Sequence, residues 1–165
     1  MADQPPNVEL APGTSENLLD ENLFRFLLDL EVQRALRLQY PISVVCIAAD
    51  LRPQEVDPSF TRRVARMVLR QIRATDVVTM LSQASIGLLL VDADTGALPR
   101  IHRRVKEELE AHPLTVQGRE RRLTWSAGGG CYPQTATGGR DLLRQASDLM
   151  ARAQGEGGDR LYLPV

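Results

Sequence analysis

Two apolar runs on either side of a four-residue loop constrain the fold of this chain more than any other feature. The runs are Val77–Leu81 and Ile86–Val91, and the loop between them is Ser82-Gln83-Ala84-Ser85. Short runs of valine, isoleucine and leucine around a polar loop predict a β-hairpin. Because the apolar runs are nearly continuous, we expect both strands to be buried on both faces, near the centre of a sheet.

The rest of the chain alternates helical and strand patterns. Residues 1–16 contain three prolines and no periodicity, so we expect a disordered lead-in followed by one domain over 17–165. The patterns predict helices over 18–39, 59–73, 97–111 and 139–153, and further strands over 42–49, 114–117, 123–132 and 161–163, with 114–117 paired to 123–132. In the first helix, the inward stripe is expected to include Leu23, Phe24, Leu28, Ala35 and Leu38. This order predicts an α/β fold with a mixed central sheet of about five strands covered by helices, plus a peripheral hairpin.

Composition narrows the possible partners. The net charge is −1, which gives no overall field toward nucleic acid or a membrane surface. No apolar run approaches the roughly 20 residues of a membrane span, and the N-terminus lacks the pattern of a secretory signal. Cys46 and Cys131 both lie in apolar runs and are expected to be reduced. We therefore expect a cytoplasmic protein that binds neither nucleic acid nor membrane.

Four segments together resemble the GGDEF domain, the bacterial diguanylate cyclase that joins two GTP molecules into cyclic di-GMP. They are FLLDLEVQRALR with PISVVCIAAD, DVVTMLSQASIGLLL, LTWSAGGGCYP and ASDLMARAQGEGGDRLYL, which occur in the family's order between about residues 18 and 163. The resemblance implies the nucleotidyl-cyclase (palm-like) α/β sandwich. It also makes Gly128-Gly129-Gly130 a close-packing or bulge site.

The active-site positions of the family are altered in this chain. The resemblance places the two metal-binding acids at Ala48 and Ala84, and the next acid of the loop at Ser85. Ser82 and Gln83 stand in place of the two loop glycines. Gln154 stands in place of the phosphate-binding lysine. The segment that carries the guanine contacts is shortened into Leu51–Ser59, and Asp50 alone remains, as a weak ligand of hydrated Mg²⁺ or as a solvated strand end. Two-metal phosphoryl transfer requires carboxylates. We therefore expect no enzyme activity, no metal and no cofactor.

One further motif of the family is present. Arg73-Ala74-Thr75-Asp76 lies five residues before the loop, where the family has an RxxD site that binds cyclic di-GMP; Arg104, or the neighbouring Arg100, falls where many members add a second arginine. An arginine fork can hold guanine O6 and N7, and an aspartate can accept from guanine N–H groups. Alternatively, Arg73 only meets a helix dipole and Asp76 only caps a turn. The chain is thus either a cyclic di-GMP receptor or a nucleotide-independent module that binds a protein partner or itself.

Overall fold

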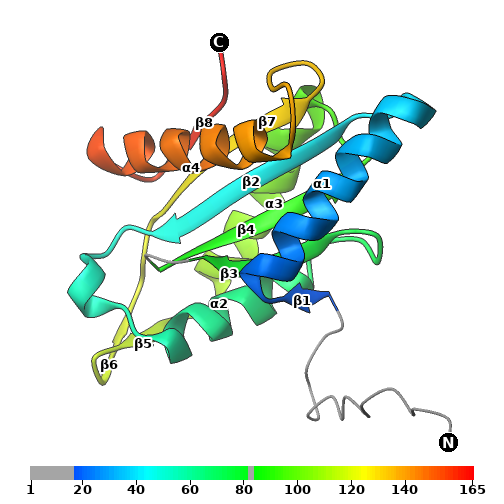
Figure 1. The fold of residues 1–165 in the computed structure, drawn as a ribbon. Helices are drawn as coiled ribbons and strands as arrows, with labels where there is room; N and C mark the ends of the chain where they lie inside the picture. The colour runs from blue at the N-terminus through cyan, green and yellow to red at the C-terminus, as the bar shows by residue number, and fades with distance from the viewer. Residues whose placement is uncertain (1–16, 82–83) are drawn as a thin grey trace, which may run out of the picture.

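The computed structural model describes residues 17–81 and 84–165, so the expected lead-in over 1–16 and the loop residues Ser82 and Gln83 lie outside the described residues. A six-stranded sheet lies between two pairs of helices (Figure 1). The pair on one face is α1 (Glu21–Leu38) and α4 (Gly139–Gly155), and the pair on the other is α2 (Pro58–Leu69) and α3 (Leu98–Ala111). Two 3₁₀ turns, η1 (Pro53–Glu55) and η2 (Thr95–Ala97), precede α2 and α3.

The central sheet is mixed, as the sequence predicts. Its strands run in the order β1-β3-β4-β2-β7-β8, with parallel pairing at β1–β3 and β7–β8 and antiparallel pairing elsewhere. The bounds are β1 (Leu18–Leu19), β2 (Ile42–Ala49), β3 (Val77–Leu81), β4 (Ser85–Val91), β7 (Trp125–Tyr132) and β8 (Leu161–Tyr162). The sheet has six strands, because the two residues of β1, predicted as the start of a helix, pair with Val78 and Thr79 of β3.

All eight residues of β2 are buried, so this strand is covered on both faces. Of the two hairpin strands for which such burial was predicted, β4 is almost fully buried, whereas β3 is only partly buried. Successive side chains enter opposite layers of the core, since strand side chains alternate. Val44, Cys46 and Ala48 pack in the cluster under α1 and α4. Val45, Ile47 and Ala49 pack in the cluster under α2 and α3. The strand therefore connects the two halves of the core.

The prediction that 114–117 pairs with 123–132 is wrong. The strand β5 (Leu114–Val116) pairs with β6 (Arg119–Arg121) in a separate two-stranded sheet. Gln117 and Gly118 both have positive φ, at 50° and 79°, which is the backbone of a tight two-residue hairpin turn. The following strand β7 is then free to pair with β2 and β8. The peripheral hairpin is thus present, but it is smaller than expected.

The predicted inward stripe of α1 is too wide. Phe24, Leu28 and Ala35 are buried, whereas Leu23 and Leu38 are 43% and 65% exposed. Because α1 rests on the sheet and on α4 through one narrow stripe, apolar residues to either side of that stripe face solvent. Within the described parts of the chain, no helix combines the length and apolar character needed to cross a membrane.

Candidate functional site

The ends of β2 and β4 meet where the resemblance places the metal-binding acids. Ala48 pairs with Ser85 across the two strands, and Ala84 lies in the hairpin turn with φ 63°. Ala48 and Ser85 are both buried. An alanine offers no side-chain oxygen to a cation, and Mg²⁺ requires carboxylate or other oxygen ligands in near-octahedral geometry. Neither alanine can therefore supply a side-chain ligand to Mg²⁺.

Asp50, the remaining acid beside these positions, is held by the chain itself. Its carboxylate accepts hydrogen bonds from the Thr124 hydroxyl at 2.5 Å, the Ser126 hydroxyl at 2.6 Å and the Asp159 backbone N–H at 2.9 Å. A Cβ on Gly158 would lie 2.6 Å from Asp50 Oδ2, so the last loop passes directly over the carboxylate. Through these hydrogen bonds Asp50 connects the end of β2 to β7 and to the loop before β8. It is therefore not a solvated strand end.

Gln154 of α4 is also engaged with the backbone. Its side-chain amide donates to the carbonyl oxygen of Ala49 at 3.2 Å. An uncharged amide here supplies no positive charge for a triphosphate. Among the described residues, no group of three or more histidine, cysteine, aspartate or glutamate side chains is placed to hold a metal ion.

A mostly apolar cavity of about 360 Å³ lies between the hairpin and the start of α2, where the shortened segment 51–59 runs. Its lining includes Pro53, Val56, Asp57, Pro58, Thr61, Met80, Leu81 and Ala84. Asp57, the acid in this lining, accepts from the Phe60 N–H at 2.8 Å and so serves as the N-cap of α2. The cavity thus has the size for a small molecule, but its acid already caps a helix.

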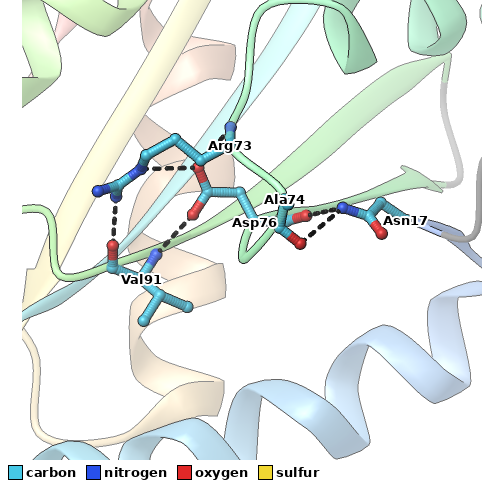
Figure 2. Close-up of polar contacts among 5 residues, drawn as sticks. All are labelled: Asn17, Arg73, Ala74, Asp76 and Val91. Carbon is cyan, nitrogen blue, oxygen red and sulfur yellow. Dashed lines mark hydrogen bonds and ion pairs between the residues drawn. The ribbon is translucent and has the colours of Figure 1, made fainter.

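Arg73 and Asp76 contact each other at the junction between α2 and β3 (Figure 2). Asp76 Oδ2 accepts from the Arg73 backbone N–H at 3.1 Å and from Arg73 Nε at 3.4 Å. Asp76 Oδ1 accepts from the Val91 backbone N–H at 3.0 Å. Arg73 Nη2 in turn donates to the Val91 carbonyl oxygen. The pair therefore connects the turn before β3 to the end of β4.

The two side chains of this pair differ in exposure. Asp76 is only 2% exposed, and both of its carboxylate oxygens accept hydrogen bonds from the chain. The Arg73 side chain is 54% exposed. Asp76 therefore caps the turn, as the structural interpretation of the motif expects, while the guanidinium that it orients remains accessible to a ligand.

Asn17 completes this junction and was not found from the sequence. Its side-chain amide donates to the carbonyl oxygens of Ala74 at 3.0 Å and Asp76 at 2.8 Å (Figure 2). The contact joins segments nearly sixty positions apart. No local pattern marks such a residue, because the pairing arises only when β1 lies beside β3.

The structure does not bring Arg100 and Arg104 into the same network. Both are exposed on α3, at four-residue spacings before Glu108, which forms a 3.8 Å ion pair with Arg70 at the end of α2. That pair places the helix face of Arg100 and Arg104 beside α2. Within the described residues, no hydrogen bond or ion pair joins either arginine to Arg73 or Asp76, or to any other side chain.

Comparisons with known proteins agree with this architecture. The family model described as "Diguanylate cyclase, GGDEF domain" matches residues 55–160. No curated protein matches the sequence.

Solved structures share the fold at low sequence identity. The GGDEF domain of YfiN (TpbB) from Pseudomonas aeruginosa is 22% identical, with a TM-score of 0.77 over 90% of this chain and 97% of that one. The GGDEF domain of DgcB from Caulobacter crescentus, in complex with c-di-GMP, is 13% identical, with a TM-score of 0.76 over 94% and 98%. The diguanylate cyclase SiaD from Pseudomonas aeruginosa, in complex with its activator SiaC, is 15% identical, with a TM-score of 0.74 over 88% and 58%.

Proposed function

The chain belongs to the GGDEF domain family, and we propose that it is a cytoplasmic member without diguanylate cyclase activity that binds cyclic di-GMP through Arg73. The observation that carries the receptor proposal is the half-exposed guanidinium of Arg73, held in one orientation by a buried carboxylate. The proposal of inactivity is carried by Ala48 and Ala84, which stand at the positions of the metal-binding acids.

The loss of activity follows from the ligands that the hairpin end offers. The side chains of Ala48 and Ala84 carry no oxygen, and the carboxylate of Asp50 already accepts three hydrogen bonds. Without carboxylates to hold two cations, neither attack on GTP nor departure of pyrophosphate is assisted.

We expect no cyclic di-GMP when the protein is incubated with GTP and Mg²⁺ or Mn²⁺, because the site does not fit either ion. The measurement is chromatography of the nucleotide products, with an active GGDEF domain as positive control. Product formation above the protein-free background, lost on heat denaturation, would contradict the proposed inactivity.

The free edge of the Arg73 guanidinium suits a guanine. Nε donates to Asp76 and one N–H of Nη2 donates to Val91, so the outer edge formed by Nη1 and the second N–H of Nη2 remains available. Two parallel N–H groups match O6 and N7 of guanine. Arg100 and Arg104 supply exposed positive charge on the adjacent helix for the two phosphates. The complex of DgcB with c-di-GMP shows that a protein with this fold takes that ligand.

We expect cyclic di-GMP to bind with micromolar affinity, roughly 8 kcal/mol, and Arg73→Ala to weaken binding at least about tenfold. Equilibrium dialysis with labelled dinucleotide measures both. Arg66→Ala is the matched control, since Arg66 is an exposed arginine on α2 and its removal changes the net charge equally. Absence of retention at tens of micromolar, or equal retention by the Arg73 and control variants, would refute the receptor proposal.

The second candidate is a protein-interaction module that needs no nucleotide. Exposed apolar side chains on α1 favour it, because large apolar residues that face solvent often mark a contact surface. SiaD, which shares the fold, is seen with a protein activator. A protein that fails to bind cyclic di-GMP but associates through α1 would support this candidate over the receptor.

A further inference from the structure

A mostly apolar cavity of about 330 Å³ lies where the end of α1, the start of β2 and the end of β7 come together. None of the described residues that line it carries a charge, and two tyrosines and two prolines are among them. Its main members are Leu36, Gln39, Tyr40, Pro41, Tyr132 and Pro133. Because a charged group is costly to bury without a partner, this lining favours a neutral ligand over a nucleotide.

The Tyr132 side chain supplies an unused hydrogen-bond donor in this cavity. The residue is 7% exposed, and its hydroxyl forms no hydrogen bond to any described residue. The hydroxyl of Tyr40, by contrast, already donates to Glu31 Oε2 at 2.8 Å, which holds the second ring in place. A buried polar group without a partner is unfavourable, so a ligand that brings an acceptor to Tyr132 is favoured.

A proline-rich segment combines an apolar surface with free acceptors. The polyproline II helix has no internal hydrogen bonds, so its carbonyl oxygens remain available to a hydroxyl. Its rings pack against aromatic side chains, and such segments are recognised by grooves that aromatic residues line. The chain itself contains Gln4-Pro5-Pro6 before β1. A residue that precedes proline is already restricted to extended backbone, which reduces the entropy lost on binding.

The position of β1 determines which prolines can reach the cavity. In the strand order β1-β3-β4-β2-β7, β1 and β7 are four steps apart, or about 19 Å at ~4.8 Å per step. The register places Asn17 and Tyr132 toward the same end of the sheet. At about 3.1 Å per residue, the eleven residues from Pro6 to Asn17 span up to about 34 Å, and the five from Pro12 only about 16 Å. Pro5 and Pro6 can therefore reach the cavity, whereas Pro12 cannot.

We propose that Pro5 and Pro6 of the same chain occupy this cavity. Their rings pack between Leu36 and the two tyrosines, and a carbonyl oxygen of the segment accepts a hydrogen bond from the Tyr132 hydroxyl. The contact covers Leu36, which is 70% exposed in the described structure, and joins the N-terminal segment to the end of α1. It involves no nucleotide, so it does not rest on the proposed binding of cyclic di-GMP.

The contact is tested in the full chain by a nitroxide spin label on Ala2→Cys, because both native cysteines are buried. A nitroxide broadens the NMR signals of nearby amides, so docking is expected to weaken the signals of Leu36 and Gln39 relative to the chemically reduced label. Labelled chain mixed with unlabelled, ¹⁵N-enriched chain reports contacts between copies. Unchanged signals in the labelled chain would overturn the proposal. Equal broadening in the mixed sample would also overturn it, because the occupant would then come from a second copy.

Three variants of the labelled chain test the chemistry of the contact. Joint Pro5→Ala and Pro6→Ala removes the rings, and Tyr132→Phe removes only the hydroxyl; each is expected to lower the ratio of docked to undocked chain at least about fivefold. Pro12→Ala is the matched control, because it loses the same ring at a position that cannot reach the cavity. Circular dichroism verifies the folding of Tyr132→Phe. Broadening that persists without Pro5 and Pro6, or that is lost equally in Pro12→Ala, would refute the proposed occupant, and broadening that persists in Tyr132→Phe would refute the hydrogen bond.

Discussion

Replacing Asp76 by alanine is expected to lower the free energy of unfolding by about 3 kcal/mol. The buried carboxylate accepts from two backbone N–H groups, those of Arg73 and Val91, and each loses its partner in the variant. An unsatisfied buried donor costs about 1–3 kcal/mol. For a domain of this size the expected fall in Tm is roughly 6–12 °C. Urea and thermal unfolding, followed by circular dichroism, measure the effect.

The control for this prediction is Arg73→Ala. The Arg73 side chain is half-exposed and its Nε lies 3.4 Å from Asp76, so the loss of the pair is expected to cost less than about 1 kcal/mol. The two variants should therefore separate the two roles of the motif. Asp76→Ala is expected to lower the free energy of unfolding, whereas Arg73→Ala is expected to weaken the binding of cyclic di-GMP. Equal, small changes in stability for the two variants would show that Asp76 does not organise the junction.

The parts of the fold that local composition specifies were predicted well. The β3–β4 hairpin and the buried strand β2 follow from continuous apolar runs, although β3 is less buried than expected because it lies next to the edge strand β1. Short elements were not predicted from the sequence. β1 has two residues and no pattern of its own, and it exists only because Leu18 lies beside Val78. Similarly, the partner of β5 depends on the turn at Gln117 and Gly118, not on apolar content.

The candidate site shows the same division. The proximity of Arg73 and Asp76 follows from a spacing of three residues across one turn. The burial of Asp76 does not, since it depends on Val91, which reaches the motif only through the hairpin. Asp50 was expected to be solvated or to bind Mg²⁺ weakly, because the sequence does not reveal that Thr124, just before β7, and Ser126 of β7 hydrogen-bond to its carboxylate. The hydrogen bonds that hold Asp76 and Asp50 in place join segments far apart in the sequence, so local sequence patterns do not predict them.

The close approach of α4 to β7 should make Gly128→Ala strongly destabilising. A Cβ at this position would lie 2.2 Å from the Ala146 carbonyl oxygen and 2.3 Å from the Met150 backbone nitrogen. Both atoms belong to the backbone of α4, so no side-chain rotation relieves the overlap and the helix must move away from the sheet. We expect a loss of about 3 kcal/mol in the free energy of unfolding, the upper part of the range for overpacked cores.

Gly155→Ala provides the matched control for the same substitution on the same helix. Gly155 is the last residue of α4, and a Cβ there would meet no atom within 4 Å. Because alanine restricts the unfolded chain and favours helix, this variant is expected to be stabilised by about 0.5 kcal/mol. Chemical denaturation of both variants measures the difference. A loss below about 1 kcal/mol in Gly128→Ala would mean that α4 shifts at little cost and that its contact with β7 does not fix the position of Gln154.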